Sequence, residues 1–301
     1  MDIVELIREL DIRVEGINCS SVDTLGQVTH SPENMTYATF VSHMDYLKDL
    51  DDRAKVIITT EEIGKEILES LPEVGVAIVE DPTITFFRLH NHLLSNENYG
   101  RKRFEKKIGE GCRISPCAHI ADSCVAIGDN VVIEENVVIR ENVTIGSGSI
   151  IRAGAVIGGE GFEFKRDGKR IMGITHGGGV VIGENVEVQY NSCIDKAIYP
   201  WDDTIIGDYT KIDDLVYVAH GCKIGEAVLI ASNAVVGGRV KIGPNTWIGF
   251  GATMRNGIEL GSNSRANIGA VVTKNVEDGG AVSGNFAIDH NLFIEKMRNN
   301  R

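Results

Sequence analysis

Aromatic residues are scarce in this chain: Phe, Trp and Tyr make up only 6% of its 301 residues, although 43% of the residues are hydrophobic and 34 are glycine. Most protein cores use aromatic rings to fill volume, so a core here must be built from aliphatic side chains. Proline is also rare, with six residues. No window approaches 18 uninterrupted apolar residues, which excludes a membrane-spanning helix.

Positive charge is in deficit as well. Lys and Arg total 30 against 43 Asp and Glu, which gives a formal net charge of −13. Nucleic acids and anionic membrane surfaces both require a basic face, so we expect neither as a partner. The six cysteines form no CxxC pair and no Cys/His metal spacing, and the N-terminus lacks the charge order of a signal peptide. We therefore expect a reduced, cytoplasmic protein without a bound metal or integral membrane contact.

An aliphatic residue recurs at every sixth position. One series runs from Ile127 to Ile157, and another from Ile206 to Val272 holds twelve apolar anchors in succession. Period six fits neither a helix nor an alternating strand, but it is typical of a parallel β-helix in which three hexapeptides form each coil. An ordinary parallel α/β sheet would need helical segments between its strands, and none is present between 112 and 276. We expect about seven coils, with glycine and other small residues at the tight corners.

Two interruptions of the repeat, 158–180 and 196–204, should leave the prism as loops, which often carry function. The flanks differ. AKVIITT (54–60) and VGVAIVE (74–80) predict buried strands around a helical EEIGKEILESL, and ITFFRLHNHLL (84–94) predicts a further helix.

The predicted organisation is therefore a small α/β domain over 1–108 and a β-helix over 109–280. A C-terminal tail over 281–301 follows, in which DHNLFIEKMRNN predicts one short helix.

Four further stretches concentrate polar and aromatic residues, and they are IDDLVYVAHGCKIG (212–225), GEGFEF (159–164) with GITHGGGVVIG (173–183), EVQYNSCIDK (187–196) and TYATFVSHMDYL (36–47). Together with the hexapeptides they resemble the UDP-3-O-acylglucosamine N-acyltransferases of lipid A synthesis, within the left-handed β-helix hexapeptide acyltransferases. The resemblance extends from about residue 15 to 290. It implies an all-β left-handed parallel β-helix with an N-terminal nucleotide-binding α/β domain.

The resemblance also implies an activity: transfer of an acyl group from a thioester to the amine of a nucleotide-linked amino sugar, without a covalent enzyme intermediate. The co-substrate would be acyl-CoA or acyl carrier protein, no cofactor would be bound permanently, and the protein would be a homotrimer. His220 would be the general base, with Asp213 as its polar partner. An imidazole titrates near pH 6.5 and suits removal of a proton from an amine. Gly238, one coil above His220, is expected to offer its N–H to the oxyanion.

The remaining matched positions imply binding roles. Phe40 and Tyr46 would sandwich the base of the nucleotide, and Phe162 and Phe164 would line an acyl channel. Polar contacts with substrate would come from Asn191, Asp195 and His176, and Lys274 would meet CoA phosphates.

Three positions depart from the family pattern: Asp214 replaces an Asn, Gly257 replaces a second His, and His43 stands where an Asn would read the base. The C-terminal helical extension is also short. These departures leave open a dTDP-amino sugar and a short acyl-CoA as substrates. A non-catalytic scaffold is a further alternative. A hexapeptide carbonic anhydrase would need three zinc-binding His, and after residue 120 only His176 and His220 lie near the repeat.

Overall fold

The computed structural model describes residues 1–95, 99–284 and 287–299. These residues divide into two compact units. The smaller unit contains 1–103 together with both interruptions of the repeat, 160–179 and 197–203, and the larger unit contains the remaining described residues. The two interruptions are therefore continuous with the β-helix in sequence but pack with the smaller unit.

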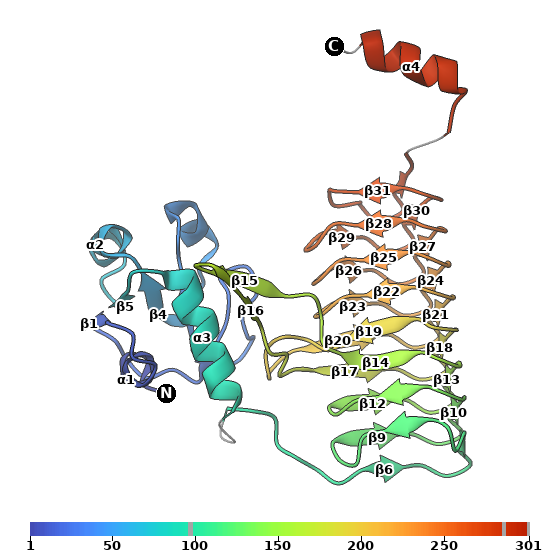
Figure 1. Cartoon of the computed structure of the whole chain (residues 1–301), viewed down its shortest axis with the longest axis horizontal. Coiled ribbons are helices and arrows are strands. Elements are labelled where there is room, and N and C mark those ends of the chain that lie inside the picture. Colours follow the sequence, from blue (N-terminus) through green and yellow to red (C-terminus); the bar gives the residue numbers. More distant parts are fainter. Residues whose placement is uncertain (96–98, 285–286, 300–301) are drawn as a thin grey trace. The chain divides into compact units, whose positions relative to one another are not determined.

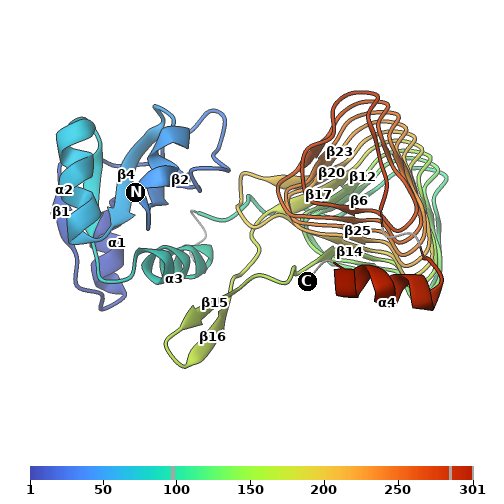
Figure 2. The ribbon, with the colours of Figure 1, turned by 90° about the horizontal axis from the view of Figure 1, so that it is seen from above.

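The larger unit is a three-sided parallel β-helix, whose stacked strands are seen in Figure 1 and whose triangular outline is seen in Figure 2. The first face has nine strands, which are β7 (Arg113–Ile114), β10 (Val132–Ile133), β13 (Ile150–Ile151), β18 (Glu187–Val188), β21 (Lys211–Ile212), β24 (Leu229–Ile230), β27 (Trp247–Ile248), β30 (Arg265–Ala266) and β32 (Ala281–Val282). The second face has eight, which are β8 (His119–Ile120), β11 (Val138–Ile139), β14 (Val156–Gly159), β19 (Cys193–Asp195), β22 (Tyr217–Val218), β25 (Val235–Val236), β28 (Thr253–Met254) and β31 (Val271–Val272). The third face has eight, which are β6 (Lys107–Ile108), β9 (Val125–Ile127), β12 (Val143–Ile145), β17 (Gly179–Ile182), β20 (Asp203–Ile206), β23 (Lys223–Ile224), β26 (Lys241–Ile242) and β29 (Glu259–Leu260).

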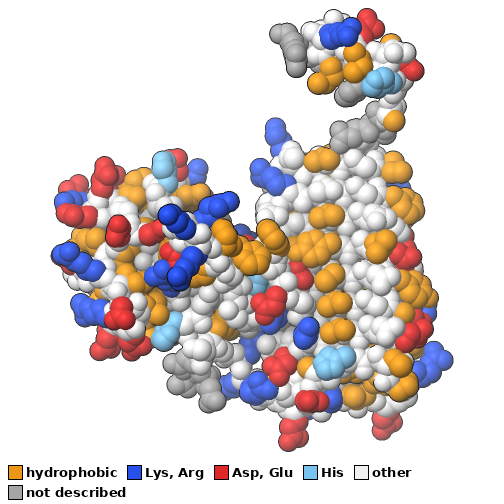
Figure 3. All heavy atoms as spheres, viewed as in Figure 1, with side chains coloured by type: hydrophobic (Ala, Val, Ile, Leu, Met, Phe, Trp, Pro, Cys, Tyr) orange, Lys and Arg blue, Asp and Glu red, His pale blue; other side chains and the backbone are white. Residues whose placement is uncertain are grey.

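The hexapeptide anchors form the core of the prism, as the sequence predicts. Every anchor from Ile127 to Val272 is at most 4% exposed, and together they form one continuous hydrophobic cluster. The residue four places after an anchor also points inward, as at Val131 and Ala234. Aliphatic residues thus stack in columns, and outward residues alternate with them. Figure 3 shows that hydrophobic side chains also form rows on the visible outer surface of the prism.

The predicted number of coils, about seven, is too small. Strands already begin at Lys107, and the faces hold eight or nine strands each. Ile108, Ile114 and Ile120 share the six-residue period, but the step from Ile120 to Ile127 is seven residues long. This extra residue breaks the pattern at the first coil, where Ile108 is still 46% exposed.

The corners match the prediction only in part. The third residue after most anchors has a positive φ, and it is most often Asn, as at Asn130 and Asn233, or Gly, as at Gly148. Asn tolerates this left-handed conformation better than other residues with a side chain. Some corners hold Leu215 or Arg239 instead, so small residues are not required there.

The smaller unit is an α/β fold whose sheet has the order β1-β5-β4-β3-β2, with only β1 antiparallel to its neighbour. Its strands are β1 (Glu15–Ile17), β2 (Thr24–Leu25), β3 (Tyr37–Phe40), β4 (Ala54–Thr59) and β5 (Gly75–Ile78). Its helices are α1 (Ile3–Glu9), the 3₁₀ turn η1 (Met44–Asp49), α2 (Glu61–Ser70) and α3 (Pro82–Leu94). The predicted strands and helices of residues 54–94 are confirmed.

Helix starts in this unit follow ordinary capping chemistry. Asp2 accepts hydrogen bonds from the N–H groups of Val4 and Glu5, and Asp81 accepts one from Ile84 ahead of Pro82 at the first helical position. The first interruption forms a hairpin of β15 (Phe164–Asp167) and β16 (Arg170–Gly173), so it is not a structureless loop. The predicted C-terminal helix is α4 (His290–Asn299), part of the tail beyond the prism.

Two adjacent isoleucines of β20 test the inward columns directly. Ile206 is 1% exposed and Ile205 is 37% exposed. We expect Ile206→Ala to lower the free energy of unfolding by about 2–5 kcal/mol, because it leaves a cavity, and Ile205→Ala to lower it by about 1 kcal/mol or less. Urea unfolding followed by circular dichroism measures both. Equal losses in the two variants would contradict the assignment of the columns.

Candidate active site

Two insertions and His220 lie at the same corner of the prism in three successive coils. The strands β14, β19 and β22 lie side by side in register on the second face. After them the chain leaves the prism beyond Gly159, leaves it again beyond Lys196, and then turns through His220. We call this edge, where the chain passes from the second to the third face, the His220 corner. Both insertions therefore start directly below His220 in the stack.

His220 is 5% exposed and its imidazole lies against the backbone of the next coil. A methyl group added to Gly238 would come within 2.6 Å of the Nε2 atom of His220. Glycine at this position therefore provides the space that the ring occupies. The structure confirms that Gly238 lies one coil above His220.

The same column continues upward through Asn256 and Lys274, each one coil of 18 residues further. The N–H of Gly238 donates to the side-chain oxygen of Asn256 at 3.1 Å. An oxyanion would have to compete with Asn256 for that hydrogen, so the donor role of Gly238 stays a prediction. Lys274 is exposed at the top of the column, and its contact with CoA also stays a prediction.

Asp195 lies at the His220 corner, one coil below Ala219 and His220. Its side chain is buried, and its Oδ2 accepts a hydrogen bond of 2.6 Å from the hydroxyl of Tyr217. Burial and this acidic neighbour raise the pKa of Tyr217, so the phenol remains a donor. Asp195 is thus a fixed, buried carboxylate at the corner, where its predicted contact with substrate is untested.

Asp213 is not brought to His220 within the chain. Asp213 follows β21 and His220 follows β22, so the two residues lie at opposite ends of the second face. The carboxylate of Asp213 accepts hydrogen bonds from the N–H and hydroxyl of Ser232. Burial alone would raise the pKa of Asp213, but these hydrogen bonds hold it below its usual value. The predicted role of Asp213 as the polar partner of His220 is therefore not met within one chain, because a full face of the prism separates the two residues.

Two cysteines near the corner carry protonated thiols. Burial and the Asp195 carboxylate raise the pKa of Cys193 to about 11, and complete burial raises that of Cys222 to about 12. The thiolate is the nucleophilic form of cysteine. Neither thiol is therefore an activated nucleophile at neutral pH.

Three other predicted or noted positions have structural roles at corners. Asn191 has φ of 56° and is exposed, so it is one of the left-handed corner residues. Asp214 accepts a hydrogen bond of 3.1 Å from the N–H of Tyr190 in the coil below. Gly257, where the family pattern has a His, is itself a corner residue with φ of 72°.

The predicted base-stacking pair lies in the smaller unit. Phe40, on β3, packs with Phe86 and Phe87 of α3 at centroid distances of 4.9 and 5.8 Å. Tyr46, on η1, is 49% exposed. His43 caps the same turn and accepts a hydrogen bond from the N–H of Asp45. Phe40 thus belongs to an aromatic cluster, and the sandwich of a base between Phe40 and Tyr46 stays a prediction.

The aromatic pair in the first interruption is exposed. Phe162 and Phe164 contact each other edge to face at 4.9 Å, and they are 86% and 48% exposed. On the opposite side of the hairpin, Lys165 lies over the ring of Phe87 at 4.8 Å. The contact of these two phenylalanines with an acyl chain stays a prediction.

His176, in the same interruption, is buried within the smaller unit. Its Nδ1 atom is 2.9 Å from the carbonyl oxygen of Ile174, and its backbone N–H donates to Glu160. The neighbouring His90 contacts the carbonyl of Thr175, and burial lowers the pKa of His90 to about 4. These contacts give His176 a role in ordering the interruption, and its contact with substrate is untested.

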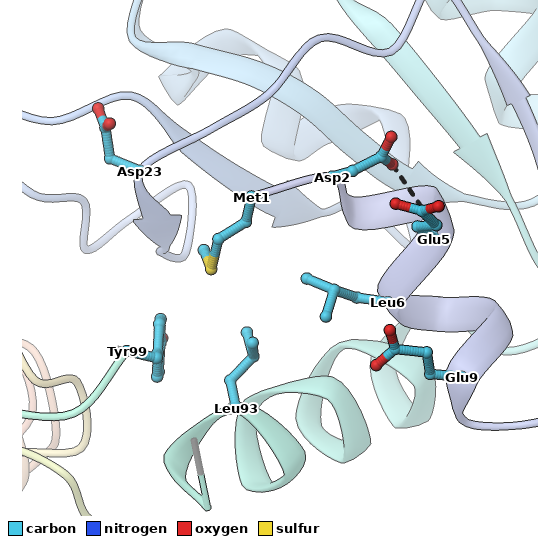
Figure 4. A pocket seen from close by; sticks show the side chains of 8 residues that line it. All are labelled: Met1, Asp2, Glu5, Leu6, Glu9, Asp23, Leu93 and Tyr99. Atoms are coloured by element: carbon cyan, nitrogen blue, oxygen red, sulfur yellow. Dashed lines mark hydrogen bonds between the residues drawn. The ribbon is translucent and has the colours of Figure 1, made fainter. Parts of the chain in front are cut away.

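A cavity of about 320 Å³ opens in the smaller unit, between α1 and α3. Figure 4 shows that carboxylates surround much of it, and its lining residues are Met1, Asp2, Glu5, Leu6, Glu9, Asp23, Leu93 and Tyr99. Four carboxylates would repel the phosphates of a nucleotide. This cavity is therefore unsuited to the predicted nucleotide, and neither Phe40 nor Tyr46 lines it.

Sequence reasoning missed Tyr217 and Thr204 at the corner. Tyr217 precedes the anchor Val218 and so points outward, in register with Cys193. Thr204 stands at an inward position that small residues usually fill, two residues before the anchor Ile206. The available signal for Thr204 was a polar residue in an inward column directly after an insertion.

The described residues include no group of three or more His, Cys, Asp or Glu side chains that could hold a metal ion. None of the helices in the described part of the chain is both long enough and apolar enough to cross a membrane.

Comparisons with known proteins agree with this architecture. The family model for the bacterial transferase hexapeptide (six repeats) matches residues 124–159 and 203–238. UDP-3-O-acylglucosamine N-acyltransferase 1 of Francisella tularensis subsp. holarctica is 47% identical over 75 residues, which is 24% of this chain and 21% of the relative. The corresponding enzyme of Dechloromonas aromatica is 46% identical over 70 residues, 23% of this chain and 20% of the relative. The match thus spans about a fifth of the length of these relatives.

Solved structures resemble a larger part of the chain. The UDP-N-acetylglucosamine acyltransferase of Arabidopsis has a TM-score of 0.53 and 28% identity, covering 65% of this chain and 67% of that one. The corresponding enzyme of Bacteroides fragilis has a TM-score of 0.51 and 27% identity, covering 57% and 65%. The sequence repeat, the three-sided prism and these similarities agree on a left-handed hexapeptide-repeat β-helix, and the chain is similar in sequence or fold to UDP-3-O-acylglucosamine N-acyltransferases and UDP-N-acetylglucosamine acyltransferases.

Proposed function

We propose that this protein transfers an acyl group from a thioester to the amine of a nucleotide-linked amino sugar, with His220 as the general base. The observation that carries the proposal is the His220 corner. There the imidazole packs beneath the backbone of Gly238, and two long insertions leave the prism in the coils below it. The names of the sequence relatives support an N-acyltransferase, and UDP-3-O-acylglucosamine is the acceptor that those names state.

The chemistry follows from the acceptor. The amine nitrogen attacks the thioester carbonyl, so a C–N bond forms, and the nitrogen must lose a proton. His220 takes that proton. The tetrahedral intermediate then collapses, the C–S bond breaks, and the proton passes from the imidazolium to the leaving thiolate. Atoms and charge balance without any further reactant.

Direct attack on the thioester fits the corner better than an acyl-enzyme intermediate. An acyl-enzyme formed on cysteine would require a thiolate, and the raised pKa values of Cys193 and Cys222 keep both thiols protonated. This supports a role of His220 on the acceptor amine over a role in activating either of these cysteines.

Acyl-CoA and acyl carrier protein remain the two candidate donors. Lys274 and Arg255 stand above His220 on the same edge of the prism and are exposed, which suits the phosphates of either donor. A screen of UDP- and dTDP-linked amino sugars against both donors, followed by thiol release, identifies the pair. No thiol release with any pair would reject the proposed function in favour of a scaffold.

We also propose a homotrimer. On the first face, Leu229 and Trp247 are register neighbours and are 40% and 37% exposed, and Phe250 and Ile268 at the following corner are 52% and 61% exposed. Apolar patches of this kind mark protein interfaces. Light scattering measures the assembly, and a monomer at micromolar concentration would contradict this proposal.

Replacement of the base is the first activity test. We expect His220→Ala to lower kcat by about 10²–10⁴-fold, the usual contribution of general acid–base catalysis. Asp213→Asn serves as the matched control, because Asp213 bonds Ser232 and does not reach His220. Full activity in His220→Ala would reject the base assignment.

Gly238→Ala tests the position of the imidazole without removing it. The backbone of Gly238 does not have a positive φ, so alanine is compatible with it, but the added methyl would displace the His220 ring. We expect kcat to fall at least about 10-fold, since misplacing a reacting group by about 1 Å is costly. Gly100→Ala is the control, because a methyl group there meets nothing within 4 Å. Unchanged kcat in Gly238→Ala would show that the ring position does not matter.

Cys193→Ala distinguishes direct transfer from a covalent route. Because the Cys193 thiol is protonated at neutral pH, we expect kcat within about twofold of the parent. Mass spectrometry of the protein mixed with the acyl donor alone should find no acylated species. Loss of activity together with an acylated parent protein would establish an acyl-enzyme instead.

A further inference from the structure

Buried hydroxyl groups inside the prism follow a common pattern. Ser192 donates to the carbonyl of Asp213 at 2.6 Å and accepts from the N–H of Val216 at 3.0 Å. Thr210 likewise donates to the carbonyl of Gly225 at 2.9 Å and accepts from the N–H of Val228 at 3.1 Å. In each case both partners of the hydroxyl belong to the coil above. The hydroxyl donates to the carbonyl of the residue directly after an anchor, and it accepts from the N–H of the residue two places before the following anchor. These hydroxyls therefore join one coil to the following one.

Thr204 departs from this pattern. It is 0% exposed, but its hydroxyl donates to the carbonyl of Asp195 at 2.6 Å, which lies just before the second insertion in the same coil. The same hydroxyl oxygen accepts a hydrogen bond from the N–H of Gly221 at 2.8 Å. By the common pattern the partners would be Ala219 and Cys222. The carbonyl partner is thus Asp195, in the same coil as Thr204, and the N–H partner is Gly221, which directly follows His220.

The two hydrogen bonds hold the backbone at two places, which are Asp195 in the coil below His220 and Gly221 directly after it. Gly221 directly follows His220 and has φ of 69°, so its N–H orientation sets the sharp turn out of the histidine. Asp195, below it, is held a second time through its carboxylate by the hydroxyl of Tyr217. Thr204 thus closes the neck of the second insertion and ties that neck to the histidine turn.

We propose that Thr204 is a positioning residue for the general base: its buried hydroxyl, by joining Asp195 to Gly221, fixes the turn that aims the His220 imidazole. This inference rests on the proposed function in one respect, which is that an effect on kcat is expected only if the protein transfers acyl groups. The ring is bounded above by Gly238 and its backbone is held from below by Thr204, so the two restraints act from opposite sides. A base must be held within about 0.5 Å of its productive position for full activity.

The chain offers a closely matched control. Thr204 and Thr210 are both fully buried threonines at inward positions, and each hydroxyl bridges one carbonyl and one N–H. Thr210 is bonded to Gly225 and Val228, away from the His220 corner. Thr204→Val and Thr210→Val therefore lose equivalent hydrogen bonds with the same change in shape, and Thr204→Ser retains the hydroxyl.

Three measurements on the full-length protein test the inference: the thermal midpoint, kcat and KM for acyl transfer, and the titration of His220 by NMR of ring-labelled histidine, assigned with His220→Ala. We expect both valine variants to lower the midpoint similarly. Only Thr204→Val should lower kcat at least 10-fold with KM within twofold and shift the His220 titration. Thr204→Ser should restore both kcat and the titration.

The opposite outcomes are equally clear. If Thr204→Val and Thr210→Val have the same kcat and the same His220 titration, Thr204 is only a structural bond and the inference is wrong. If the parent protein transfers no acyl group to any acceptor, the proposed function fails, but a His220 titration that moves in Thr204→Val alone still supports the positioning role.

Discussion

The larger unit depends on one backbone constraint, which is that the chain must turn sharply every six residues through a left-handed conformation. For residues with a side chain this conformation costs about 1–2 kcal/mol each. The cost recurs at corners that hold a residue with a side chain, such as Leu215 and Arg239, whereas glycine avoids it at other corners. It is offset because each turn adds another aliphatic anchor to a column that is shielded from water. The repeat is thus stable only as a stack, and a single coil would not fold alone.

The same constraint makes the prism a rigid support for chemistry. Strands of two or three residues leave little freedom between corners, so a side chain at a corner has a fixed height and direction. Gly159, Lys196 and His220 follow strands that are paired in register, and this pairing stacks the starts of both insertions under the histidine. The insertions leave the prism at the His220 corner, and they pack with the smaller unit.

Much of this fold could be predicted from sequence because the signal is periodic. The inward columns were predictable from the six-residue spacing alone, and the secondary structure of 54–94 from local patterns. The resemblance implied the role of Asp213, but a motif does not show which hydrogen-bond partner its carboxylate takes, and that partner is Ser232. The resemblance likewise implied the role of Phe40, whose ring contacts come from Phe86 and Phe87, 46 and 47 residues later. The role of Thr204 could not be predicted from sequence, because it depends on which carbonyl and which N–H its hydroxyl joins, and only the folded chain shows these partners.

The placement of both insertions at one corner has a consequence for how such a protein can change. Each coil contacts only its two neighbours, so an altered insertion perturbs the adjacent layers and leaves distant ones in register. The neck of the second insertion is closed by Thr204 and Asp195, which isolates the chain beyond the neck from the strands below it. Ile198 and Tyr199 of the second insertion are buried in the core of the smaller unit, so a change of length is tolerated better at the exposed turn between β15 and β16 of the first insertion. The architecture separates a rigid frame from exposed loops, so new specificities can arise by substitution of loops on an unchanged prism.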